Sequence, residues 1–74
     1  MDRDHIFRAM KNSLRLSENP TIKDTMETVK GWDSLSHLTL MMDLEREFNI
    51  RFPMDSIPDL NTVESIVKTI EEES

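Results

Sequence analysis

Apolar residues recur at helical spacing in the first and last parts of the chain. Between Arg3 and Leu16 one stripe is formed by Ile6, Phe7, Met10 and Leu14. After Asn61 the apolar positions follow i, i+3, i+4 and i+7, at Val63, Ile66, Val67 and Ile70. Each pattern is typical of an amphipathic helix with one buried face. Asp2 or Asp4 can cap the first helix, and Asn61 with Glu64 resembles a capping box for the last.

A third stretch, from Ser34 to Phe48, has two adjoining apolar sides. One side contains Leu40, Met41, Leu44 and Phe48, with His37 among them, and the other contains Leu35, Leu38 and Met42. Together they cover well over half of the helix, whereas a surface helix needs an apolar stripe about 100° wide. Either this helix is central and contacts two neighbours, or the second side is exposed for a partner. His37 is expected to be a partly buried structural residue.

A long polar connection joins the first two helices. Asn19-Pro20 is a turn signal, because the residue before proline avoids the helical conformation. Three isolated apolar residues, Ile22, Met26 and Val29, can hold a loop, or one helical turn around residues 24–28, against the bundle. About 16 residues is long for a connection in a small domain, where about 4–6 is usual, and such loops are often functional. Trp32 is expected to seal this loop onto the core.

The second connection contains one further short element. Asn49 is a plausible left-handed end for the central helix. Ile50 and Phe52 predict an extended connector with two core anchors. A short helix capped by Asp55 follows, limited to about one turn by Pro58.

These elements predict an all-α, four-helix up-down bundle with a long first loop and a short third helix, folded as a single domain over residues 1–74.

Charge and composition narrow the classes of function. The net charge of -6 argues against nucleic-acid binding and favours basic partners, or only keeps a small domain soluble. The chain has no cysteine for a disulfide or a thiolate metal site, no apolar run of about 20 residues to span a membrane, and no signal peptide at its start. We expect a cytoplasmic monomer with no metal site.

The stretch Gly31-Trp32-Asp33-Ser34-Leu35 holds the only glycine and the only tryptophan. Asp33 is a good N-cap, which places Ser34 in the first turn of the central helix. A nucleophilic serine needs a base within reach, and His37 is turned toward the core. There is no Gly-x-Ser-x-Gly elbow, and no nucleotide or metal motif, so we predict no catalytic residue. A serine hydroxyl at a helix N-terminus does suit the attachment of a phosphate group, because the helix dipole and free N–H groups favour negative charge.

This motif resembles the attachment site of the acyl carrier protein family. The resemblance extends over the whole chain, through the long first loop, the run from Leu44 to Ile50 and the closing helix around Thr62-Val63-Glu64. It implies a carrier and not an enzyme, with 4'-phosphopantetheine attached covalently to Ser34 between Asp33 and Leu35. The implied partners are a phosphopantetheinyl transferase, an acyl-loading ligase or transferase, and downstream biosynthetic enzymes. The surface expected to meet them consists of Leu35, Leu38, Met42, Asp43 and Glu45.

One departure from the family pattern suggests a specialised role. Carriers of fatty-acid synthesis resembling this chain usually have more acids on this helix, where Ser36, Thr39 and Arg46 stand here. The resemblance therefore favours a dedicated carrier of acyl or aminoacyl groups in a specialised pathway. The alternative is a helical interaction module that keeps the fold without the arm. Four methionines, Met10, Met26, Met41 and Met54, could yield space to a tethered acyl chain or simply fill gaps in the core.

Overall fold

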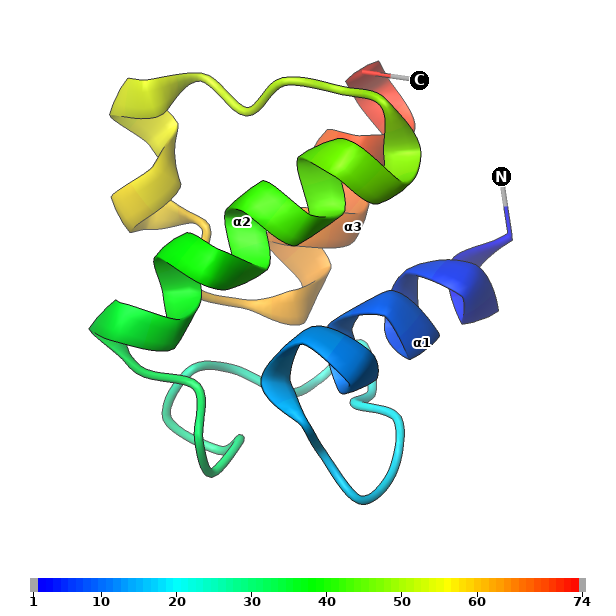
Figure 1. Ribbon diagram of the computed structural model, residues 1–74, viewed down its shortest axis with the longest axis vertical. Coiled ribbons are helices and arrows are strands. Elements are labelled where there is room, and N and C mark those ends of the chain that lie inside the picture. Colours follow the sequence, from blue (N-terminus) through cyan, green and yellow to red (C-terminus); the bar gives the residue numbers. More distant parts are fainter. Residues whose placement is uncertain (1, 74) are drawn as a thin grey trace.

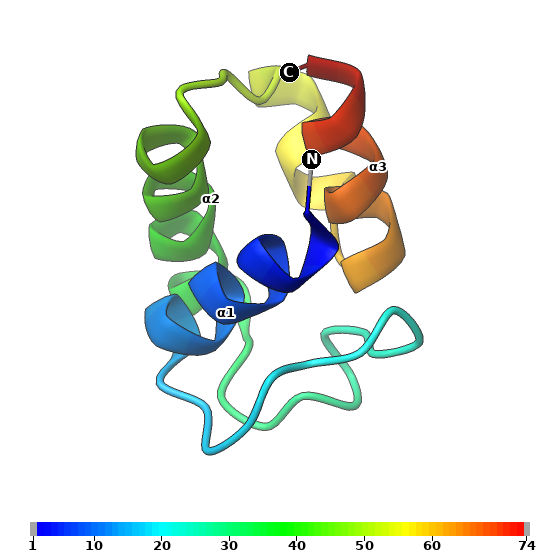
Figure 2. The ribbon, with the colours of Figure 1, turned by 90° about the vertical axis from the view of Figure 1, so that its right-hand side faces the viewer.

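Helices account for most of the part of the chain that the structure describes. The computed structural model describes residues 2–73, with α1 (Arg3–Leu14), α2 (Ser34–Phe48), the 3-10 helix η1 (Met54–Asp59) and α3 (Val63–Glu73). In Figure 1, α1 and α2 run in opposite directions, and α3 lies behind α2. Figure 2 shows α2 and α3 on opposite sides of the molecule, with α1 in front of them and the long first loop below. The all-α four-helix prediction is confirmed.

The predicted apolar stripes face the core, although Phe7 and Phe48 are only partly buried. The core takes Ile6, Met10 and Leu14 from α1, Leu40, Met41 and Leu44 from α2, and Val63, Ile66, Val67 and Ile70 from α3. Four connector residues complete it: Trp32, Ile50, Phe52 and Leu60. Removing such apolar surface from water stabilises the fold by about 25 cal/mol per Å². Of the four methionines considered as able to yield space in the interior, Met10 and Met41 are buried and Met26 is partly buried, whereas Met54 is 84% exposed on η1.

Two predicted helix ends are found in the structure. Asp2 caps α1, since its carboxylate accepts a 3.0 Å hydrogen bond from the backbone N–H of Asp4. Asn49 ends α2 in the left-handed conformation, with a φ of 55°. The first helix is two residues shorter than predicted, because Arg15 also adopts the left-handed conformation, at a φ of 57°.

Two predicted caps are wrong. Thr62, and not Asn61, caps α3, because its Oγ1 accepts the backbone N–H of Ser65 at 3.1 Å. Asp55 lies inside the first turn of η1, which follows Pro53 and has no side-chain cap. This element also runs through Pro58 for six residues instead of stopping after one turn. Proline fits there because the residues on either side of it supply the 3-10 bonds, including that from Leu60 N to Ile57 O.

The long first loop is attached to the start of α3. A single turn forms at residues 25–29, where the carbonyl of Thr25 accepts the N–H groups of Thr28 and Val29 at 3.0 Å each, and Thr25 also pairs with Thr62 in an isolated β-bridge. The N–H of Met26 donates to Asn61 O at 2.9 Å, and that of Val63 donates to Asp24 O at 3.0 Å. The expected apolar anchors of the loop are partly buried against the core, and Trp32 is fully buried, as predicted.

Candidate functional site

Ser34 is the first residue of α2, and its side chain is exposed. The residue before it, Asp33, is extended, with a φ of -131°. Its carboxylate caps the helix by accepting the N–H groups of Leu35 and Ser36, each at 3.0 Å. The predicted cap is therefore present, and it fixes the backbone on both sides of Ser34.

A second set of hydrogen bonds closes the backbone turn that precedes Ser34, and it was not predicted from the sequence. The hydroxyl of Ser36 accepts the N–H of Asp33 at 2.8 Å and donates to the carbonyl of Gly31 at 2.8 Å. Gly31 has a φ of 96°, a conformation that other residues rarely adopt. The available signal was the Asp-x-x-Ser spacing, a capping box with serine in the place usual for glutamate.

His37 is held from both sides in the interior, beneath the serine. The indole N–H of Trp32 donates to His37 Nδ1 at 3.0 Å, and His37 Nε2 donates to the carbonyl of Ile57 at 2.8 Å. Because the carbonyl can only accept, the ring carries its proton on Nε2. His37 is 5% exposed, as expected for a structural residue. Both ring nitrogens are engaged, so His37 is not placed to serve as a base for Ser34.

The second apolar side of α2 faces outward. Leu35 is 82% exposed, Leu38 57% and Met42 58%. Large apolar side chains that form a continuous exposed patch are typical of interaction sites. This settles one of the open alternatives, because no element among residues 2–73 covers the second side of α2.

The family model of the phosphopantetheine attachment site matches residues 31–70, which include this motif, α2, η1 and most of α3. An acyl carrier protein of Phytoplasma australiense is 39% identical over 69 residues, covering 92% of this chain and 91% of that protein. One from Brachyspira hyodysenteriae is 32% identical over 71 residues, covering 93% and 91%.

The chain belongs to the acyl carrier protein family. Members of this family are carriers and not enzymes, and their prosthetic group is covalently attached 4'-phosphopantetheine. The fold agrees: the solution structure of a holo acyl carrier protein from Geobacter metallireducens superimposes with a TM-score of 0.83. That comparison is at 22% identity and covers 95% of this chain and 82% of the other.

Asp43 and Glu45 were expected to contact partners of the carrier. Each of these carboxylates accepts a hydrogen bond from another residue of the chain. The hydroxyl of Ser13 donates to Asp43 Oδ2 at 2.6 Å, and the N–H of Phe52 donates to Glu45 Oε2 at 2.8 Å. Asp43 thereby links α2 to α1, and Glu45 holds the connector that follows α2. These two contacts join residues 30 and 7 positions apart, so no local pattern could have indicated them.

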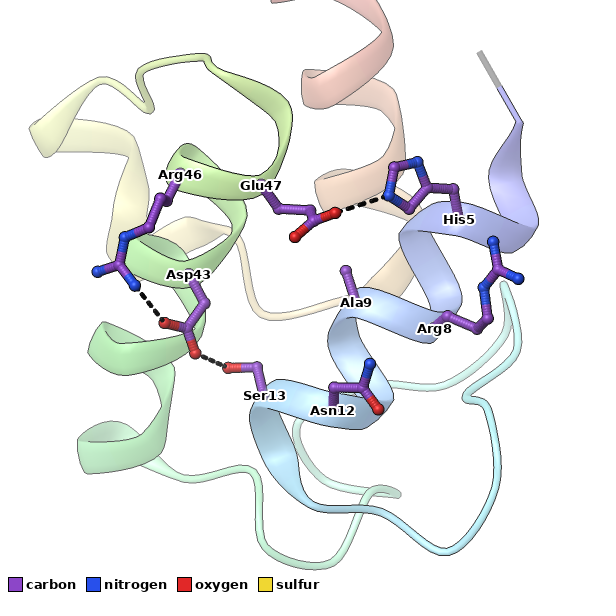
Figure 3. Close-up of a pocket in the computed structure, with 8 residues that line it drawn as sticks. All are labelled: His5, Arg8, Ala9, Asn12, Ser13, Asp43, Arg46 and Glu47. Carbon is purple, nitrogen blue, oxygen red and sulfur yellow. Dashed lines mark hydrogen bonds and ion pairs between the residues drawn. The ribbon is translucent and has the colours of Figure 1, made fainter.

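A polar groove separates α1 from α2 in the carrier (Figure 3). Its volume is about 520 Å³, and it is lined by His5, Arg8, Ala9, Asn12, Ser13, Asp43, Arg46 and Glu47. His5 Nε2 lies 2.8 Å from Glu47 Oε2 across this groove, and Arg46 lies 3.9 Å from Asp43. The contacts that cross the groove from α1 to α2 are His5 with Glu47 and Ser13 with Asp43, whereas Arg46 and Asp43 both belong to α2. The serine at the head of α2 is not part of the lining.

The surroundings of Ser34 fit a phosphodiester, with one correction. The Ser34 hydroxyl is exposed and makes no hydrogen bond to residues 2–73, so it is accessible for modification. The sequence suggested that free N–H groups of the first turn favour a phosphate, but those of Leu35 and Ser36 are already bound by Asp33. What favours a negative group at Ser34 is thus the helix dipole and access to solvent.

Two further findings concern the part of the carrier that the structure describes. Its helices are too short or too polar to cross a membrane. Nor do three or more His, Asp or Glu side chains there converge on a site able to hold a metal ion.

The pKa of the Asp33 carboxyl is held below its usual value, first by the hydrogen bond from the N–H of Ser36 and also by that from the N–H of Leu35. A lowered folded pKa stabilises the protein above the unfolded value, and this contribution is lost as the pH falls through the folded value. We expect Asp33→Asn, which keeps the cap without titrating, to weaken the loss of stability below about pH 4. Urea unfolding of both proteins at a series of pH values measures this. Identical pH dependence would contradict it.

Proposed function

We propose that Ser34 carries the 4'-phosphopantetheine arm and that the bundle presents acyl or aminoacyl groups to successive enzymes. The observation that supports this is an exposed, unbonded serine hydroxyl in the first turn of α2, inside the matched attachment-site region. When bound, the arm supplies a terminal thiol that holds the cargo as a thioester. The chain's own part is to fix the attachment point, through the Asp33 cap before it and the Leu35 N–H after it.

In the loading step, the transferase moves the phosphopantetheinyl group of coenzyme A to Ser34. The new bond joins Ser34 Oγ to the phosphorus that carries the pantetheine, and the P–O bond of the pyrophosphate of coenzyme A breaks. The hydroxyl proton passes to the transferase, and the adenosine bisphosphate part of coenzyme A departs. Asp33 does not act as the base in this proposal, because its carboxylate is bound to two backbone N–H groups.

We propose a dedicated carrier rather than the general one of fatty-acid synthesis. Ser36 closes the turn before the helix, and Thr39 and Arg46 are exposed, so none of these positions supplies the acid that the family resemblance leads one to expect. A carrier lacking those acids suits its own acyl-loading ligase or transferase and its own downstream enzymes.

The surface proposed to meet these enzymes is centred on Leu35, Leu38 and Met42, all on the exposed side of α2. Asp43 and Glu45 belong only to its edge, because each carboxylate already accepts a hydrogen bond from within the chain.

Incubation with coenzyme A and a broad-specificity phosphopantetheinyl transferase tests the assignment. We expect the intact mass to rise by one phosphopantetheinyl group, and peptide mapping to place that group on Ser34. The control is the same mixture without coenzyme A. An unchanged mass would contradict the carrier hypothesis and favour the alternative, a helical interaction module that has no arm. A mass gain on another residue would disprove the assignment of Ser34.

A further inference from the structure

The hydroxyl of Ser36 closes the backbone turn that precedes the proposed attachment serine. It accepts the N–H of Asp33 at 2.8 Å and donates its single proton to the carbonyl of Gly31, also at 2.8 Å. The carbonyl of Asp33 lies further from this hydroxyl, at 3.3 Å. One side-chain oxygen in the first turn of α2 therefore joins the two residues on either side of Trp32.

Neither of these two backbone groups has another partner among residues 2–73. Within that part of the chain, the N–H of Asp33 and the carbonyl of Gly31 bond only to the Ser36 hydroxyl. Both residues are exposed, so water can bind these groups when the hydroxyl is removed. Removal would therefore cost the fold little, but the backbone would regain conformational freedom, most of all at Gly31, which has a φ of 96°.

The other anchors of this segment are side-chain contacts. Trp32 is 2% exposed and its indole is bound to His37, so this residue stays in the core. The Asp33 carboxylate accepts two backbone N–H groups of α2. Neither contact engages the backbone N–H of Asp33 or the carbonyl of Gly31. The Ser36 hydroxyl is thus the group that orders the backbone leading into Ser34.

The exposed carboxylate next to Ser34 makes the order of this turn matter for loading. Asp33 is negative, and so is the phosphate group that approaches Ser34, so the two charges repel each other more strongly when they are closer. With the turn closed, the carboxylate is directed at the N–H groups of α2. A loose turn would leave this charge free to move, and it would have to be ordered again when an enzyme binds.

We infer that Ser36 is a positioning residue for the loading of Ser34, because its hydroxyl holds the preceding turn in the conformation that the transferase binds. This inference rests on the proposed attachment at Ser34. Ser36 takes no part in forming the bond to phosphorus. Without its hydroxyl, the turn becomes ordered only when the enzyme binds, so the loss raises KM and leaves kcat unchanged.

Arm transfer from coenzyme A by the broad-specificity transferase tests the inference. We expect Ser36→Ala to raise KM at least about fivefold, which corresponds to ordering about one backbone residue, and to leave kcat within about twofold of the wild-type value. Ser36→Thr keeps a hydroxyl at the same position and should restore the wild-type KM. Thr39→Ala is the matched control, because it removes an exposed hydroxyl of α2 that makes no hydrogen bond to residues 2–73.

Amide hydrogen exchange gives a second readout, which separates order in the turn from stability of the bundle. We expect the Asp33 N–H to be protected in the wild-type chain and in Ser36→Thr, and to exchange freely in Ser36→Ala. The N–H of Leu44, inside α2, should stay protected in all three proteins. Loss of protection at Leu44 in Ser36→Ala would assign Ser36 to the stability of the helix and overturn the inference.

The kinetic outcomes are equally distinct. An unchanged KM in Ser36→Ala, a loss carried by kcat alone, or an equal loss in Ser36→Thr would overturn the inference while leaving Ser34 as the attachment site. Free exchange of the Asp33 N–H in the wild-type chain would do the same. Failure of the wild-type chain to gain the arm would instead overturn the proposed function itself.

Discussion

Replacing Ser34 by alanine is expected to abolish arm addition completely while leaving the bundle folded. Alanine has no hydroxyl to form the bond to phosphorus. The Ser34 side chain makes no hydrogen bond to the described residues, and alanine is the best helix former, so α2 should keep its first turn. The Asp33 cap is also retained, because it uses the backbone N–H groups of Leu35 and Ser36. Intact mass after incubation with the transferase, together with circular dichroism, measures both outcomes.

The matched control is Ser17→Ala, which removes an exposed serine hydroxyl from the long first loop. We expect this variant to be loaded as fast as the wild-type chain. If Ser34→Ala still gained the arm, another hydroxyl would be the attachment point. If it lost its helical signal, Ser34 would have a structural role that its lack of contacts does not indicate.

Replacing Leu40 by alanine is expected to lower the free energy of unfolding by about 2–5 kcal/mol. Leu40 is completely buried in the core between the helices, so truncation loses apolar contacts and leaves a cavity. Small domains have a total stability of only about 5–15 kcal/mol, which makes this loss a large share of the total. Urea unfolding followed by circular dichroism gives the value.

Leu38→Ala is the matched control, since it makes the same chemical change two positions away on the same helix. Leu38 is 57% exposed, and we expect its truncation to cost no more than about 0.5 kcal/mol. The two leucines should thus separate cleanly: one variant unfolds more easily, and the other folds normally but is loaded slowly. Equal destabilisation would mean that the second apolar side of α2 belongs to the core.

Elements that depend on nearby residues could be predicted from the sequence. Apolar residues at helical spacing indicated the three long helices, and Asp33 and Asn49 were identified as the ends of α2 because caps follow from local backbone chemistry. The choice between Asn61 and Thr62 as the cap of α3 failed because both residues can cap. It is the β-bridge to the first loop that engages the backbone of Asn61, leaving Thr62 next to the helix.

At the candidate functional site, too, local features could be predicted from the sequence and tertiary contacts could not. The motif indicated Ser34, but the periodicity could not tell whether Leu35, Leu38 and Met42 were covered, because that depends on where the other helices pack. The indole of Trp32 was expected to be buried, yet its bond to His37 requires a particular side-chain orientation across a turn. Contacts of this kind are set by tertiary packing and not by spacing along the chain.

The hydrogen bonds that hold the turn at Gly31, Trp32 and Asp33 affect how a cargo could move between enzymes. Ser34 follows a turn that is tied to Ser36, braced by His37 and linked through that ring to η1. With the arm attached to Ser34, as we propose, its base would be held by these hydrogen bonds. A cargo would then cover the distance between two enzymes by rotation about the bonds of the arm, or by diffusion of the whole protein.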